Sequence, residues 1–151
     1  MTGRCLSQRL ENGDDALLLA LIEADRITQE RLVLWQRYHQ ALEPLERKGV
    51  LRRPVVPEGC RHNAHMYHIL LAPGIDRQEV LERFRCRGIS AVFHYVPLHT
   101  SPAGRRLART HGDLRTTEDL SERLVRLPLW VGLDAGQQDR IVAVLEGLGC
   151  G

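Results

Sequence analysis

Apolar residues in the stretch 15–47 recur at spacings of three and four, and charged residues fill most positions between them. Such a period predicts one long amphipathic helix, because residues so spaced share a helix face. The apolar positions include Leu17, Leu18, Leu21, Ile22, Leu32, Trp35 and Leu42. Pro44 lacks the amide proton that a helix interior needs, so it should kink or end the helix unless it begins a new turn. A helix of this length would span about 45 Å, too long to be buried entirely against a small domain.

Short apolar runs alternate with helical patterns along the rest of the chain. Strands are predicted where β-branched and aromatic residues cluster, over residues 65–71, 89–95 and 125–129. Helices are predicted over residues 76–88, 103–110, 117–124 and 134–148, with Asp76, Thr117 and Asp134 as N-caps. Prolines at residues 52–59 indicate a linker or an extended edge. This order predicts the α/β (α+β) class, with a small sheet and helices packed mainly on one face.

Composition excludes several classes of partner. The 151 residues carry 21 basic and 19 acidic side chains, a net charge of +2. No basic run with interleaved aromatics appears, so we expect no nucleic-acid partner. The longest apolar run, residues 16–22, is too short to span a bilayer, and the start of the chain does not resemble a secretory signal. We therefore expect a cytoplasmic protein with no membrane partner. Its four scattered cysteines, Cys5, Cys60, Cys86 and Cys150, should be reduced thiols.

Polar side chains gather where the predicted strand 89–95 runs into a loop with two prolines. His94 and Tyr95 are neighbours on that strand, so they should point to opposite faces. They are either ligand contacts or a half-buried tyrosine beside a solvated histidine. His99, which Pro97 and Pro102 hold in a stiff loop, is the best single candidate for a ligand contact. Its alternative is an ordinary loop histidine.

Other polar groups favour ordinary structural roles. Three histidines, His62, His65 and His68, are three residues apart, and on a strand they could not converge on a metal, so we expect no metal site. Three arginines, Arg105, Arg106 and Arg109, share a face of the predicted short helix and could bind phosphate, although a solvated helix face is the commoner arrangement. The carboxylates of Glu118 and Glu122, one helical turn apart, are expected at the surface.

One string of residues carries a family resemblance. The string His94-Tyr95-x-Pro97-Leu98-His99-x-x-Pro102, with Leu127-Pro128-Leu129 after it, resembles the C-terminal part of the DegT-type sugar-nucleotide aminotransferases. The similarity runs over about residues 16–148. These enzymes use pyridoxal phosphate (PLP) to place an amino group on a nucleotide-linked keto sugar. The resemblance implies a cleft between two domains in which His94, Tyr95 and His99 contact the substrate.

The same resemblance implies a reaction and a domain order. Glutamate would give its amino group to C4 of a dTDP-4-keto-6-deoxyhexose, for cell-surface polysaccharide synthesis. Residues 1–14 would be a tail unlike the family, residues 15–50 an interdomain helix, and residues 51–151 the small C-terminal domain of a fold-type I PLP aminotransferase. Residues near Asn12 depart from the cofactor-site loop of the family.

The chain has a single lysine, Lys48, in a charged helix end. A Schiff-base lysine must be desolvated or electrostatically tuned, and nothing around Lys48 predicts that. The family's cofactor domain is not matched. We therefore expect a C-terminal fragment that is inactive alone and holds no cofactor covalently. Its expected protein partner is a second copy, in a homodimer, or the missing N-terminal domain. The alternatives are a non-enzymatic module that self-associates or complements a separate chain, and a complete small enzyme that uses Lys48 or the histidines.

Overall fold

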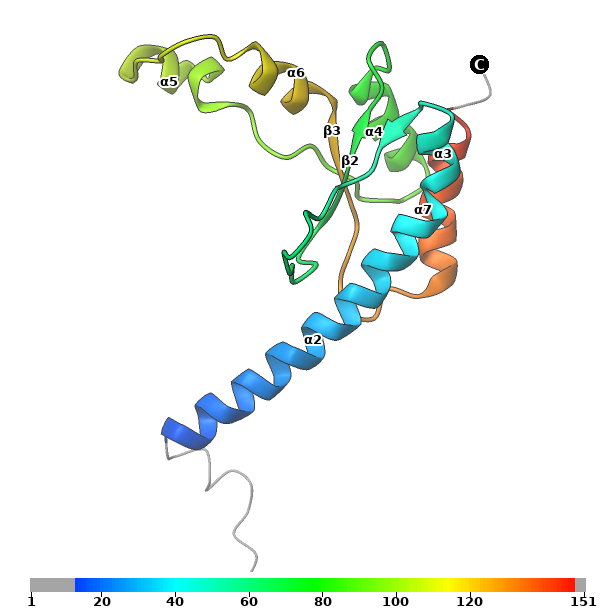
Figure 1. Ribbon diagram of the computed structural model, residues 1–151. Coiled ribbons are helices and arrows are strands. Elements are labelled where there is room, and N and C mark those ends of the chain that lie inside the picture. Colours follow the sequence, from blue (N-terminus) through cyan, green and yellow to red (C-terminus); the bar gives the residue numbers. More distant parts are fainter. Residues whose placement is uncertain (1–12, 149–151) are drawn as a thin grey trace, which may run out of the picture.

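A long helix leads into a small antiparallel sheet with helices around it in the computed structural model, which describes residues 13–148 (Figure 1). The elements in chain order are α2 (Gly13–Ala41), α3 (Glu43–Arg47), β1 (Leu51–Arg52), β2 (Tyr67–Leu71), α4 (Arg77–Cys86), the 3-10 helix η1 (Leu98–Thr100), α5 (Pro102–Leu107), α6 (Arg115–Arg123), β3 (Leu124–Leu127) and α7 (Ala135–Glu146). This arrangement confirms the predicted α/β (α+β) class. The expectations for residues 1–12, Asn12 included, lie outside the described part.

The predicted break near Pro44 is confirmed. Helix α2 ends at Ala41, and Pro44 lies in the first turn of α3, where its missing amide proton costs no helical hydrogen bond. Among the described helices none is both long enough and apolar enough to cross a membrane.

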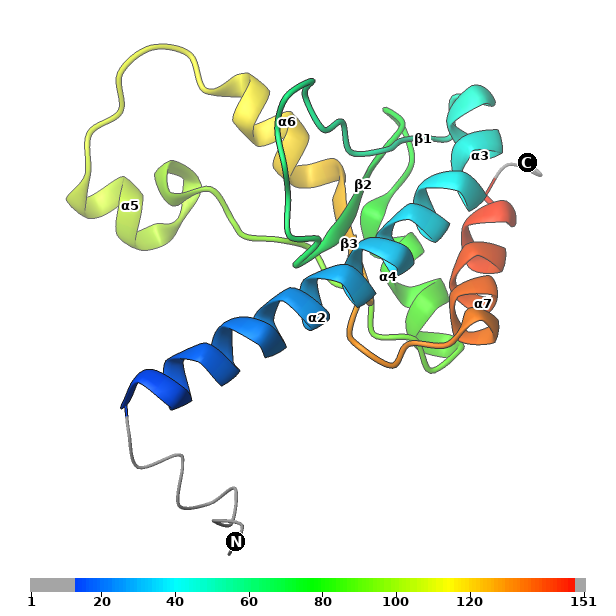
Figure 2. The ribbon, with the colours of Figure 1, turned by 60° about the horizontal axis from the view of Figure 1, so that its bottom comes forward.

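The three strands are antiparallel in the order β1-β2-β3. Tyr67 pairs with Leu127 and Ile69 with Val125, and all four side chains are buried. His68 pairs with Arg126 between them, so these two side chains point to the other face. Figure 2 shows α4 and α7 on one side of the strands and α6 on the other. The sheet therefore has one fully covered face and one partly open face.

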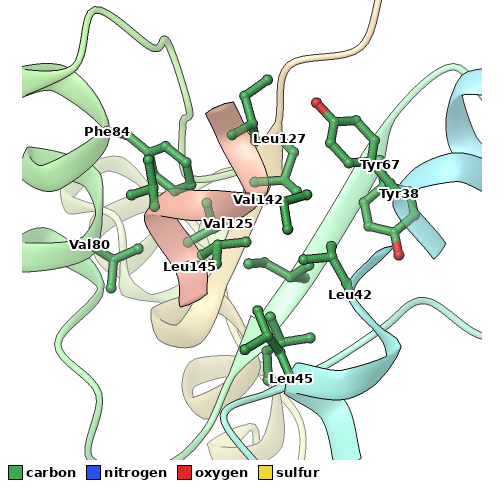
Figure 3. Packing of buried hydrophobic residues seen from close by; sticks show 14 of the residues in the cluster. Tyr38, Leu42, Leu45, Tyr67, Val80, Phe84, Val125, Leu127, Val142 and Leu145 are labelled. Atoms are coloured by element: carbon green, nitrogen blue, oxygen red, sulfur yellow. The ribbon is translucent and has the colours of Figure 1, made fainter. Parts of the chain in front are cut away.

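The core lies between α2, α4, α7 and the covered face of the sheet (Figure 3). Its largest fully buried side chains are Tyr38, Tyr67, Phe84, Leu42, Ile69, Leu71 and Leu145. Two polar groups in this core have partners. The hydroxyl of Tyr38 donates to the Pro128 carbonyl at 2.9 Å, and the Gln138 amide donates to the Leu34 carbonyl at 2.9 Å. Both bonds fix the second half of α2 against the segments around α7.

Two of the three predicted N-caps are confirmed. The Asp76 carboxylate accepts a bond from the Gln78 amide at 2.7 Å, and Asp134 forms a capping box with Gln137. The prediction for Thr117 is wrong, because α6 begins two residues earlier, at Arg115. There the Asp113 carboxylate already accepts the free Arg115 amide at 2.9 Å, so a cap at Thr117 is not needed.

The predicted strand over residues 89–95 is also wrong. Only Val92 pairs with the sheet, through a single bridge to Arg126 with N–O distances of 3.2 and 2.7 Å. At the start of the segment, the Ile89 amide instead bonds the Phe84 carbonyl at 3.0 Å and closes α4. This C-terminal turn of α4 places Gly88 at φ 70°, a left-handed conformation that glycine adopts without strain. At its other end the segment leaves the sheet toward Pro97.

Candidate functional site

Residues 93–114, which we call the arm, carry the polar residues that the sequence singles out. In both views the part of the arm that contains α5 stands away from the sheet and the core helices (Figures 1 and 2). The arm includes His94, Tyr95 and His99. Loops held by a rigid scaffold are a common location for binding groups.

Short-range bonds give the arm its shape. The Thr100 hydroxyl donates to the Pro97 carbonyl at 3.0 Å, and the Ser101 hydroxyl caps α5 by accepting the Gly104 amide at 3.0 Å. Gly104 packs so closely that a β-carbon there would lie 1.7 Å from the Leu98 carbonyl oxygen. The turn from η1 into α5 therefore requires glycine at this position. Helix α5 ends at Leu107, so the prediction that Arg109 shares its face with Arg105 is wrong.

His99 ties the arm to α6. Its Nε2 lies 3.1 Å from Oε1 of Glu118, and only 15% of its side chain is exposed. The Glu118 side chain is 45% exposed. Glu118 therefore has a specific partner in addition to its surface position. The sequence could not pair these two residues, because 19 positions separate them.

His94 and Tyr95 do not point to opposite faces. Their ring centroids are 4.3 Å apart, with planes tilted by 60°. The expectation of opposite faces is wrong because the two residues lie outside a regular strand. Tyr95 is 70% exposed, so its phenol is available to a ligand.

A cavity of about 290 Å³ lies where the arm meets α4 and α6. It is lined by Tyr95, Phe93, Arg77, Arg105, Glu118 and Glu122, among others. Arg77 fixes one wall: its guanidinium lies 5.2 Å from the Phe93 ring centroid and donates to the Ser121 carbonyl. Carboxylates, guanidinium groups and a phenol beside an aromatic wall can donate to and accept from the hydroxyls of a sugar. The sequence analysis missed Arg77, since nothing in the local pattern links residue 77 to the arm.

A second cluster, of aromatic and charged side chains, lies at the C-terminal end of α2. The His39 ring stacks on Trp35 at 4.7 Å, and the His62 ring meets the edge of Trp35 at 4.6 Å. Burial, and then the charge of Arg53, lowers the pKa of His39. Arg53 itself bonds the Glu46 carboxylate at 2.6 Å. With Trp35 buried, this cluster mainly supports the core.

The remaining candidate groups are dispersed. The His65 ring lies 3.1 Å from the Asn63 amide oxygen, while His68 lies on the partly open sheet face. Within residues 13–148 no three His, Cys, Asp or Glu side chains are placed to hold a metal ion. Cys60 and Cys86 are free and exposed. Lys48 is an exposed residue at the end of α3. An exposed amine does not match the desolvated site that the aldimine lysine of a PLP enzyme needs.

Comparison with known proteins gives a consistent result. The model of the DegT/DnrJ/EryC1/StrS aminotransferase family matches residues 5–146. The chain is 30% identical over 128 residues to a dTDP-3-amino-3,4,6-trideoxy-alpha-D-glucose transaminase of Micromonospora megalomicea. The matched stretch covers 83% of this chain and 33% of the relative. It is also 30% identical over 132 residues to a dTDP-4-dehydro-2,3,6-trideoxy-D-glucose 4-aminotransferase of Saccharopolyspora spinosa, covering 85% of this chain and 32% of the relative.

The fold matches solved structures of the same kind. The crystal structure of a DegT DnrJ EryC1 StrS aminotransferase from Brucella abortus superposes with a TM-score of 0.74 at 27% identity, covering 91% of this chain and 35% of that chain. The chain thus spans about a third of the length of the relatives that it matches.

Proposed function

We propose that this chain, which belongs to the DegT/DnrJ/EryC1/StrS aminotransferase family, supplies the sugar-binding part of a nucleotide-sugar aminotransferase. Aminotransferases of this family depend on PLP. The observation that supports the proposal is the cavity of about 290 Å³, where Tyr95 meets α6 beside the His99–Glu118 pair. Of the three residues expected from the sequence to contact substrate, Tyr95 lines this cavity, while His94 packs against Tyr95 and His99 contacts the lining residue Glu118.

The proposed roles follow from each side chain. The Tyr95 phenol and the His94 imidazole, which pack against each other, would donate to sugar hydroxyls or phosphate oxygens. His99 would hold a third substrate oxygen while Glu118 fixes its ring. Because Lys48 does not fit the cofactor, we assign this chain no step of the amino transfer itself. A cofactor-binding domain, on the same polypeptide or on another, would supply that chemistry.

The domain order proposed for this role has residues 15–50 connecting to the cofactor-binding domain and residues 51–151 forming the small domain. The amino donor would be glutamate and the acceptor a dTDP-4-keto-6-deoxyhexose. Amino transfer to C4, as in formation of dTDP-4-amino-4,6-dideoxygalactose, remains the preferred prediction. The names of the two relatives place the amino group on C3 in one and C4 in the other, so the carbon must be measured directly.

Titration calorimetry of the purified chain with dTDP-4-keto-6-deoxyglucose tests the proposal. We expect weak but saturable binding, and His99→Gln should weaken it by about tenfold, the effect of losing one hydrogen bond to a charged or strongly polar group. His111→Gln is the matched control, since His111 is an exposed arm residue outside the cavity and, unlike His99, has no bond to Glu118 or another lining residue in the described part of the chain. Equal affinities for the wild type and His99→Gln would contradict the assignment.

A second candidate function is self-association through α2. In Figure 1 the first half of this helix projects away from the other elements. Leu21 and Ile22 there are 56% and 59% exposed. Exposed apolar patches mark association surfaces, so a homodimer joined by α2 would bury them. Sedimentation at several concentrations tests this idea, and a strict monomer whose mass is unchanged by Ile22→Glu would exclude it.

A further inference from the structure

A separate cavity of about 400 Å³ lies where the segment after α4 meets the loop from β3 to α7 (Figure 2). It shares no lining residue with the cavity beside the arm. Its volume falls within the range of small-molecule sites, roughly 300–1,000 Å³. The proposed function makes no use of this cavity, so its lining must be considered on its own terms.

The floor of this cavity is apolar. Leu133 and Ile141 are buried core residues, and the half-buried Ile89 packs against the same core. Close packing holds such side chains in place, so they cannot turn outward to fill the space. The cavity therefore keeps an apolar surface on which a ligand can rest.

Trp130 lines the cavity beside this floor. Its side chain is 47% exposed, whereas that of Trp35 in the core is only 7% exposed. The Leu133 amide donates to the Trp130 carbonyl at 3.2 Å and fixes the turn that carries the indole. A half-exposed indole offers a face to another ring, and an offset stack of two rings is more favourable than the buried area alone would predict. Trp130 therefore favours a flat aromatic ligand.

Arg140 adds positive charge to the lining. Its guanidinium donates to the Arg87 carbonyl at 3.2 Å, and within residues 13–148 it forms no ion pair. No carboxylate lines the cavity, and the neighbouring Asp139 is already paired with Arg37 at 2.6 Å. A guanidinium carries several N–H donors in a planar fork that matches the two oxygens of a carboxylate. Arg140 therefore favours a ligand with a carboxylate next to its apolar part.

We propose that this cavity binds a planar aromatic carboxylate. The ring would stack on Trp130 above Leu133 and Ile141, and the carboxylate would accept hydrogen bonds from Arg140. The Ser90 hydroxyl also lines the cavity and is a second donor. An aliphatic acid would lose the stacking, and a neutral aromatic molecule would lose the charge-assisted bonds. The inference is independent of the sugar-binding role, because the two cavities have no residue in common.

The test uses the full chain and three probes of similar size in titration calorimetry at low salt. The first probe, 2-naphthoate, has both the aromatic ring and the charge. The second, 2-naphthamide, keeps the ring without the charge, and the third, decahydro-2-naphthoate, keeps the charge without the aromatic ring. We expect saturable binding of 2-naphthoate that is about fivefold tighter than binding of either other probe.

Two variants separate the contributions of charge and stacking. Arg140→Gln should weaken binding of 2-naphthoate about fivefold, as for an exposed ion pair, and leave binding of 2-naphthamide unchanged. Trp130→Ala should weaken both aromatic probes by about tenfold. The control is Arg61→Gln, which removes the same charge from an exposed arginine outside the cavity. Because Arg140 is exposed and Trp130 is half-exposed, both variants should keep the circular dichroism of the wild type.

NMR of the indole N–H groups gives the location, because the chain has only two tryptophans. The probe 2-naphthoate should shift the signal of Trp130 and not that of Trp35, and Trp130→Phe assigns the two signals. Equal affinity of the wild type for 2-naphthoate and 2-naphthamide would overturn the inference. A loss of affinity that Arg61→Gln reproduces, or a shift at Trp35 instead of Trp130, would also overturn it.

Discussion

The folded body, which comprises residues 13–92 and 115–148, and the arm are stabilised by different interactions. In the body, Tyr38, Tyr67 and Phe84 are completely buried, so removal of apolar surface from water holds it together. In the arm, residues 93–114, no residue is buried, and several large apolar side chains face solvent: Phe93, Tyr95, Val96, Leu98 and Leu107. Local hydrogen bonds and a few ties to α4 and α6 hold the arm in place. The contrast shows that the candidate binding groups lie on the part of the chain that contributes least to its own stability.

The largest expected effect is in the body. Phe84→Ala should lower the free energy of unfolding by about 3–5 kcal/mol, because it removes a fully buried ring and leaves a cavity against α7 and the sheet. Urea unfolding followed by circular dichroism measures this change.

Leu98→Ala is the matched comparison in the arm. The Leu98 side chain is 84% exposed, so its truncation should change the unfolding free energy by less than about 0.5 kcal/mol. A loss above about 2 kcal/mol would mean that the arm is part of the cooperative core, and the contrast between the two regions would fail.

The next effect concerns the ion pair that fastens residue 53 to α3. Arg53 donates its backbone amide and its guanidinium to Glu46, at 2.7 and 2.6 Å. Burial raises the pKa of Glu46, but the bonds from Arg53 outweigh burial and the net pKa lies below the ordinary value of 4.5. Glu46→Gln should therefore lower stability by roughly 1.5–3 kcal/mol at pH 7.

The sign of the pH dependence follows from that lowered pKa. The stabilisation by ionised Glu46 is complete above about pH 4.5, the ordinary pKa of the group, and is lost as the pH falls through the lower folded value. Urea unfolding at several pH values should show that the difference in unfolding free energy between wild type and Glu46→Gln becomes smaller in acid. Glu43→Gln, which removes an exposed pair with Arg47, is the control and should change stability by less than about 1 kcal/mol. A difference in unfolding free energy that stays the same as the pH falls would disprove the ionic contribution.

The division into body and arm also explains what the sequence could predict. Helices α2, α4 and α7 and strands β2 and β3 have buried faces that leave a periodic apolar pattern, and Asp76 and Asp134 mark two helix starts. Residues 89–95 have the composition of a strand, but Ile89 closes α4 and only Val92 reaches the sheet. Composition reports what a segment could do in a sheet, and tertiary competition decides whether it does.

The candidate site was only partly predictable for a related reason. Tyr95 and His99 stand out in the sequence because Tyr95 closely precedes Pro97, and His99 lies between Pro97 and Pro102 in the same loop. Arg77 and Glu118 belong to other elements and reach the site through packing. No periodic signal connects residues that far apart, so only the folded structure identifies them.

A smaller expected effect tests how the arm is held. Gly104→Ala would place a β-carbon 1.7 Å from the Leu98 carbonyl oxygen, so η1 and α5 must separate. We expect the global unfolding free energy to change by less than about 1 kcal/mol, while amide exchange in residues 98–108 accelerates. Gly136→Ala, where the nearest atom would be 3.4 Å away, is the control and should leave exchange in the arm unchanged. A large global loss for Gly104→Ala would show that the arm and the body unfold together.

The smallest expected effect isolates the tie between the arm and α6. Glu118→Gln weakens the contact with His99, and since Glu118 is partly exposed the cost in global stability should be at most about 1 kcal/mol. Its local effect should be larger: amide exchange near His99 should accelerate, because the imidazole loses the carboxylate that orients it. Glu122 lies one turn further along α6 and makes no ion pair in the described part of the chain. Glu122→Gln removes the same charge and should leave amide exchange in the arm unchanged. If both variants accelerate exchange equally, charge alone governs the arm and the specific His99–Glu118 contact has no role. If only Glu118→Gln does, a single weak bond sets the position of a candidate binding residue in a region that burial does not stabilise.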